Sequence, residues 1–125
     1  MAIFLALAGL FGGLGVGMGA FAAHALRTQL SEGSLQLLET AVRYQMIHAL
    51  ALGLVAVLLA RLPGVAMLWA AGWAFAWGVL LFSGSLYALA LMGSRWLGMI
   101  TPLGGVALLI GWICLAFAAR SVSGG

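Results

Sequence analysis

The chain has 125 residues, of which 66% are hydrophobic and only 6% are charged. A soluble domain carries about 25% charged residues, so this composition could not solvate a globular surface and we expect lipid to be the solvent. The net charge of +3 comes from five dispersed arginines and no lysine, which excludes a basic patch for nucleic acid. The single cysteine, Cys114, excludes an internal disulfide and a thiolate metal cluster.

The first long apolar run extends from residue 2 to about residue 26 and ends at Arg27. A cleaved signal peptide has an apolar region of about 7–15 residues behind a basic start. This run is longer, and no Lys or Arg precedes Arg27. We therefore interpret it as a membrane helix.

The second run extends from about residue 35 to residue 60 and is followed by Pro63, which stops a helix. Ser34 is expected to cap its start. At 1.5 Å per residue this helix would be about 39 Å long, which exceeds the hydrocarbon thickness of about 30 Å. Its first two turns, with Glu39 and Arg43, should therefore lie at the membrane interface.

The third run covers residues 65–92, and the fourth covers residues 96–119. Pro102 lies inside the fourth run, where its ring predicts either a kink or a late start of the helix. Backbone groups in a bilayer must be paired within the segment, so all four runs should be helices. The sequence predicts an all-α integral membrane protein, residues 1–125, forming one four-transmembrane-helix bundle with antiparallel neighbouring helices.

Small residues indicate where these helices could pack. Small side chains let helix backbones approach closely in lipid. Gly9, Gly13 and Gly17 repeat at four-residue spacing on the first helix, with Gly15 and Gly19 beside them. The helix-packing glycines predicted on the fourth helix are Gly104, Gly105 and Gly111.

Most of the polarity is concentrated between residues 24 and 48. The candidate polar cluster consists of His24, Glu39, Arg43, Tyr44, Gln45 and His48. Glu39 and Arg43 share one helix face as i,i+4 neighbours, while Tyr44 and His48 share another. An antiparallel hairpin of the first two helices could bring the two histidines together.

The cluster has a functional and a structural interpretation. Ionisable residues within the membrane suggest function by default, and histidine titrates near neutral pH, so His24, Tyr44 and His48 could relay protons. Alternatively, Glu39 and Arg43 neutralise each other at the interface while the histidines clamp helices together. No ligand spacing predicts a metal site, no cofactor is indicated, and no pattern of a catalytic nucleophile is present.

A second, weaker polar set consists of Ser83 and Ser85 on the third helix and Thr101 on the fourth. Hydroxyl side chains often form hydrogen bonds between membrane helices. We expect interhelical hydrogen bonds here rather than a transport path.

Four segments carry a family resemblance. They are GAFAAHAL (19–26), TAVRYQMIHALAL (40–52), GSLYALAL (84–91) and TPLGG (101–105). With these motifs the chain resembles the YgdD-like family of small inner-membrane proteins, which has animal relatives. The resemblance implies four transmembrane helices and an address in the bacterial plasma (inner) membrane. It also implies that His24, Arg43, Tyr44, Gln45, His48 and Pro102 belong to the family motif, with no established role.

These observations favour a non-enzymatic structural or accessory membrane protein. Its partners would be membrane lipid and either further copies of itself or a larger membrane complex. The alternative is a small transporter or channel, for protons or a small solute, that uses the His24/Tyr44/His48 and Glu39/Arg43 groups.

Overall fold

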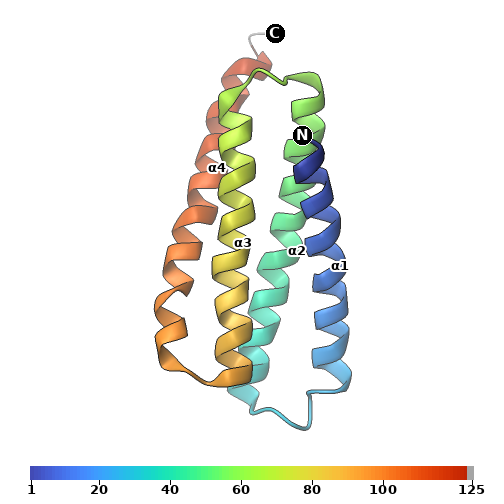
Figure 1. Cartoon of the computed structure of the whole chain (residues 1–125), viewed down its shortest axis with the longest axis vertical. Coiled ribbons are helices and arrows are strands. Elements are labelled where there is room, and N and C mark those ends of the chain that lie inside the picture. Colours follow the sequence, from blue (N-terminus) through green and yellow to red (C-terminus); the bar gives the residue numbers. More distant parts are fainter. Residues whose placement is uncertain (124–125) are drawn as a thin grey trace.

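The computed structural model describes residues 1–123, which form four long helices and one short 3-10 segment. The helices are α1 (Ala2–His24), α2 (Glu32–Arg61), α3 (Ala66–Met92) and α4 (Thr101–Ser123), with η1 (Arg95–Met99) before α4. The helices alternate in direction, so neighbours are antiparallel, as predicted (Figure 1). Four candidate spans, the last of them including η1, are long and apolar enough to cross a membrane. We call the end of the bundle with the 25–31 connection the loop end.

The start of α2 differs from the prediction. The helix begins at Glu32, one turn before the predicted start at residue 35, and its N-cap is Ser31 rather than Ser34. The Ser31 hydroxyl accepts a hydrogen bond from the Ser34 backbone N–H at 3.1 Å. This bond satisfies one of the free amides of the first turn. The added turn extends α2 further beyond the hydrocarbon at the loop end.

The fourth span is divided near Pro102. Gly93 ends α3 in the left-handed conformation (φ 74°), the chain then forms η1, and α4 begins at Thr101. Pro102 is thus in the first turn of α4, where a missing N–H breaks no helical hydrogen bond. Of the two predicted alternatives, the structure has the late start and not a kink within a continuous helix.

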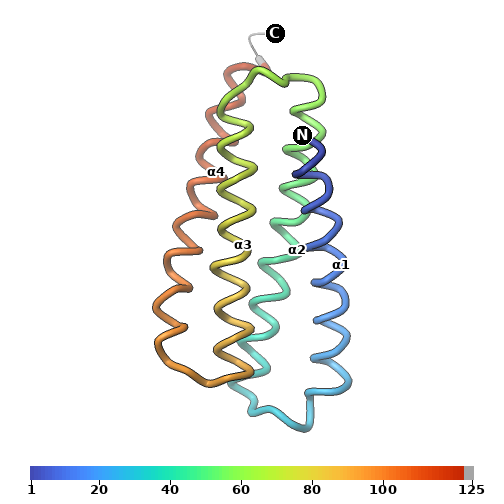
Figure 2. The backbone as a smooth tube through the Cα atoms, viewed as in Figure 1, coloured from blue at the N-terminus to red at the C-terminus, as the bar shows by residue number. Residues whose placement is uncertain are grey.

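The helices pack in chain order. The extensive contacts join α1 to α2, α2 to α3 and α3 to α4, and a smaller contact joins α1 to α3. Figure 2 shows α2 and α3 between the two outer helices. The main apolar core consists of side chains such as Phe4, Leu52, Val55, Leu59 and Phe75, all fully buried. A smaller cluster of Leu26, Leu38 and Ala90 lies toward the loop end.

The glycine stripe predicted to pack α1 does not do so within this chain. A Cβ atom added at Gly9, Gly13 or Gly17 would meet nothing within 4 Å. The glycines that face α2 are instead Gly12, Gly15 and Gly19, which are opposite Ala49, Met46 and Val42. Four-residue spacing identifies a stripe but does not tell which side of the helix the neighbour occupies, and this explains the error.

The predicted glycines of α4 behave differently. A Cβ at Gly104 would overlap the backbone of Phe82, and one at Gly111 would come within 2.6 Å of the Phe75 ring. Gly105 is less constrained, with its nearest neighbour in the Phe82 ring at 3.8 Å. Gly104 and Gly111 therefore allow the close approach of α3 and α4.

Candidate functional site: a polar layer between the helices

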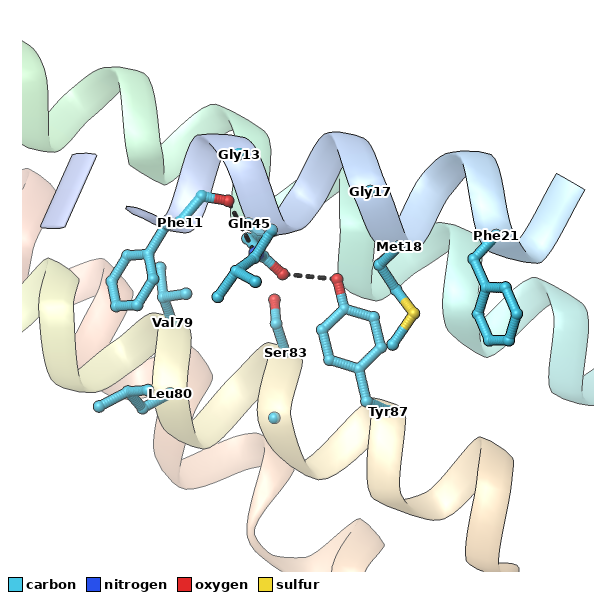
Figure 3. A pocket seen from close by; sticks show the side chains of 12 residues that line it. Phe11, Gly13, Gly17, Met18, Phe21, Gln45, Val79, Leu80, Ser83 and Tyr87 are labelled. Carbon is cyan, nitrogen blue, oxygen red and sulfur yellow. Dashed lines mark hydrogen bonds between the residues drawn. The ribbon is translucent and has the colours of Figure 1, made fainter. Parts of the chain in front are cut away.

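Gln45 connects three helices. From α2, its Nε2 atom donates to the Phe11 carbonyl oxygen on α1 at 2.7 Å. Its Oε1 atom accepts a hydrogen bond from the Tyr87 hydroxyl on α3 at 2.5 Å. Figure 3 shows the amide between the α1 backbone and the Tyr87 ring. Because both ends of the amide have a partner, its orientation is fixed.

Gly15 provides the space for this arrangement. It is buried, and a Cβ there would lie 2.5 Å from the Met46 sulfur and 3.5 Å from the Gln45 nitrogen. A side chain at this position would displace the Met46 side chain and crowd the Gln45 amide. The glycine therefore lets the Gln45 amide reach the Phe11 carbonyl.

Two serines add to these contacts. We call the side chains that form hydrogen bonds between the helices the polar layer; it consists of Gln45, His48, Ser83, Ser85, Tyr87, Thr101 and Trp112. The Ser83 hydroxyl donates to the Ala41 carbonyl oxygen at 2.8 Å and so joins α3 to α2. The hydroxyls of Ser85 and Thr101 lie 2.6 Å apart and join α3 to α4. These contacts confirm the predicted interhelical hydrogen bonds. The layer thus lies between the two apolar clusters described above.

His48 is buried between α2, α3 and α4. Its Nε2 atom is 2.9 Å from the Trp112 indole nitrogen, and its Nδ1 atom is 2.7 Å from the Tyr44 carbonyl oxygen. An indole N–H can only donate, so Nε2 must accept and Nδ1 must carry the proton. The two contacts together select the neutral Nδ1–H tautomer of His48.

This geometry limits the chemistry that His48 can perform. A second proton on Nε2 would point at the Trp112 N–H, so protonation requires that the indole move away. The ring is also enclosed by Phe75 and Trp112, whose centroids each lie 5.6 Å from its own. Within residues 1–123, no buried side-chain nitrogen or oxygen lacks a hydrogen-bond partner. The groups of the layer are thus engaged in joining the helices.

The structure separates His24 from His48. His24 is exposed in the last turn of α1, whereas His48 is 4% exposed. Gly12 faces Ala49 and Gly15 faces Met46, so the residue of α1 level with His48 is Gly13. His24 lies eleven residues further along, about 16 Å away at the helical rise. The antiparallel hairpin therefore does not bring the histidines together.

Glu39 and Arg43 do not form the expected ion pair. Both side chains are exposed, and the described residues contain no contact within 4.0 Å between their charged groups. They line, together with Arg27, a cavity of about 520 Å³ between α1 and α2. Tyr44 contacts His48 through its ring, with centroids 6.1 Å apart, and packs more closely on Phe82 at 4.5 Å.

Two further cavities border the polar layer. One, of about 480 Å³, lies between α1 and α3 beside Gln45, Ser83 and Tyr87, with an apolar lining that includes Met18 and Phe21 (Figure 3). The other, of about 450 Å³, lies between α2 and α4 beside Tyr44, His48 and Trp112. The first cavity is thus bordered by the Gln45 side of the layer and the second by the His48 side.

Sequence reasoning missed the two aromatic partners of the layer. Tyr87 lies in the family segment 84–91, and Trp112 lies in the fourth apolar run, but neither was predicted as a candidate site residue. The signal available was chemical: a buried amide and a buried imidazole both need partners, and Tyr and Trp can supply them. Among the described residues, no group of three or more His, Cys, Asp or Glu side chains is placed to hold a metal ion.

The family model DUF423, whose description is a protein of unknown function, matches residues 18–105 of the chain. The chain belongs to the DUF423 family. It is 45% identical over 119 residues to the UPF0382 membrane protein YwdK of Bacillus subtilis, covering 95% of this chain and 97% of the relative. It is also 44% identical to UPF0382 membrane proteins of Staphylococcus epidermidis (99% and 100% covered) and Haemophilus influenzae (93% and 92% covered). No solved structure matches the chain.

The DUF423 match covers all of α2, α3 and η1, together with the loop-end parts of α1 and α4. The matched range begins at Met18, within α1, and ends at Gly105, within the first turns of α4. It contains Gln45, His48, Ser83, Ser85, Tyr87 and Thr101. This chain is therefore a membrane protein of a family whose matched region includes most of the polar layer.

Proposed function

We propose that this DUF423 member is a non-enzymatic accessory protein of the bacterial plasma (inner) membrane that acts through helix contacts within the bilayer. Its bacterial relatives and its YgdD-like segments support this location. The partner in the first instance is a second copy of the chain, bound through α1. A larger membrane complex would use the same helix face.

One observation carries this proposal. Gly15, Gly104 and Gly111 each meet a neighbouring helix, whereas a Cβ at Gly9, Gly13 or Gly17 would meet nothing within 4 Å, and Gly13 and Gly17 border the open cavity between α1 and α3. Glycines beside such open space give up helix propensity without a packing gain inside the chain. A second helix lying against them would restore that gain, since small residues allow close helix contact in lipid.

The test measures self-association in bilayers. Two labelled populations in nanodiscs or vesicles should show energy transfer that rises with the protein-to-lipid ratio. The Gly13→Ile variant should weaken association by at least about fivefold, because its side chain blocks close approach. Ala116→Ile, at an exposed small residue of α4, is the matched control and should associate like wild type. A wild-type chain that is monomeric at every ratio would refute self-association.

The cavity beside Tyr44 and His48 favours a second candidate, a small proton or solute transporter. Transport requires water to reach His48. In a Cys114→Ser background, the His48→Cys variant should then react with a membrane-impermeant thiol reagent in folded protein. Protection of this cysteine, with labelling of an exposed His24→Cys control, would exclude the transporter and leave the helix-contact proposal.

A further inference from the structure

The cavity at the loop end has a composition unlike that of the polar layer. It lies between the last turns of α1 and the first half of α2 and is lined by Arg27, Glu39 and Arg43. Its remaining wall is formed by small or apolar residues, among them Ala22 and Leu35, which are partly exposed. A ligand here would meet both charged and apolar side chains.

The charges that line this cavity are not balanced among the residues that the structure describes. Two guanidinium groups face one carboxylate, which gives the lining a net charge of +1. Neither arginine forms an ion pair with Glu39 among the described residues, although all three line the same space. A monoanionic group would complete the site.

The depth of the cavity indicates which anions can reach it. Arg61 ends α2 at the opposite side, and Arg43 lies eighteen residues before it, which is about 27 Å along the helix. This separation approaches the hydrocarbon thickness of about 30 Å. With Arg61 at one boundary, Arg43 lies at the other, where lipid phosphates are located and where a long side chain can extend to them.

We propose that this cavity binds the phosphodiester group of an anionic glycerophospholipid. Arg27 and Arg43 donate to the phosphate oxygens, since the planar guanidinium fork matches phosphate geometry. Glu39 accepts a hydrogen bond from a hydroxyl of the headgroup, and Ala22 and Leu35 contact the start of an acyl chain. This site does not depend on the proposed self-association, because it uses neither Gly13 nor its neighbours on the stripe.

The test is retention of lipid by the full chain during native mass spectrometry. Wild type in mixed micelles should retain phosphatidylglycerol over phosphatidylcholine. Arg27→Gln and Arg43→Gln should each reduce phosphatidylglycerol retention at least about fivefold, and Arg43→Lys should reduce it less. Arg61→Gln is the matched control outside the cavity and should retain lipid like wild type. Glu39→Gln should still retain phosphatidylglycerol, but its preference for lipids with a hydroxyl in the headgroup should be smaller than that of wild type.

Three outcomes would overturn this assignment. They are equal retention of the two lipids by wild type, equal losses in the Arg43→Gln and Arg61→Gln variants, and displacement of the lipid by millimolar inorganic phosphate. The last would retain a phosphate site but assign it to soluble anions. Because energy transfer and lipid retention are separate measurements, failure of one proposal leaves the other standing.

Discussion

The indole nitrogen of Trp112 lies 2.9 Å from Nε2 of His48, so α4 holds the imidazole of α2 in a single tautomer. This contact links two helices that are separated in the chain by the whole of α3. His48, which the sequence suggested as a proton carrier, is therefore a hydrogen-bond acceptor at Nε2. The clamp interpretation of His48 therefore has a definite chemical basis.

Removing the donor should weaken the fold while preserving the ring packing. Trp112→Phe retains an aromatic ring near Phe75 and His48 but leaves Nε2 without a partner. We expect a loss of about 0.5–2 kcal/mol in the free energy of unfolding, measured by denaturant titration in micelles. Trp77→Phe, at a residue 59% exposed, is the control and should change stability by less than about 0.5 kcal/mol. Equal losses in the two variants would contradict the assigned hydrogen bond.

Gln45 and Tyr87 should be energetically coupled. Gln45→Leu removes the acceptor for the Tyr87 hydroxyl, and Tyr87→Phe removes the donor. A double-mutant cycle should give a coupling between about 0.6 and about 1.7 kcal/mol, which are the mean and the maximum found for hydrogen bonds between membrane helices. Purely additive losses would show that the two side chains do not interact in the bilayer.

The glycines of the bundle should divide into two classes on substitution by alanine. Gly104→Ala places a methyl group against the Phe82 backbone, which cannot move as a side chain can. We expect a loss of about 1–3 kcal/mol or more. Gly9→Ala meets no neighbour and should be neutral or stabilise the helix by up to about 1 kcal/mol. Thermal unfolding of the two variants in the same detergent compares them directly, and similar losses would argue against the α3–α4 contact.

Pro102 should be nearly dispensable for stability. Because it lies in the first turn of α4, Pro102→Ala restores no helical hydrogen bond that the fold lacks, and we expect a change below about 1 kcal/mol. Proline placed inside the same helix, as in Ala107→Pro, should cost about 3 kcal/mol or more. A large effect of Pro102→Ala on thermal unfolding would show that the proline does more than begin the helix.

The sequence predicts the helices far better than the contacts between them. Hydropathy places all four spans, because the cost of unpaired backbone groups in lipid leaves helices as the only outcome. The partners of Gln45 and His48 were not predictable in this way. Tyr87 and Trp112 are 42 and 64 residues distant, and which side chains meet depends on the register of the helices. The same register puts Gly15 rather than Gly13 against α2.

The contacts between the helices differ at the two ends of the bundle, and so at the two sides of the bilayer. Toward the Met1 end, the helices are held by apolar packing of Phe4, Leu59 and Leu68, which depends little on local polarity. Near the loop-end boundary, hydrogen bonds made by Gln45 and between Ser85 and Thr101 add to the packing of the smaller apolar cluster, and water can substitute for these bonds. Local thinning of the loop-end leaflet would admit water to those bonds. This half of the bundle should therefore loosen first as lipid chains shorten, which makes the protein respond to bilayer thickness from one side only.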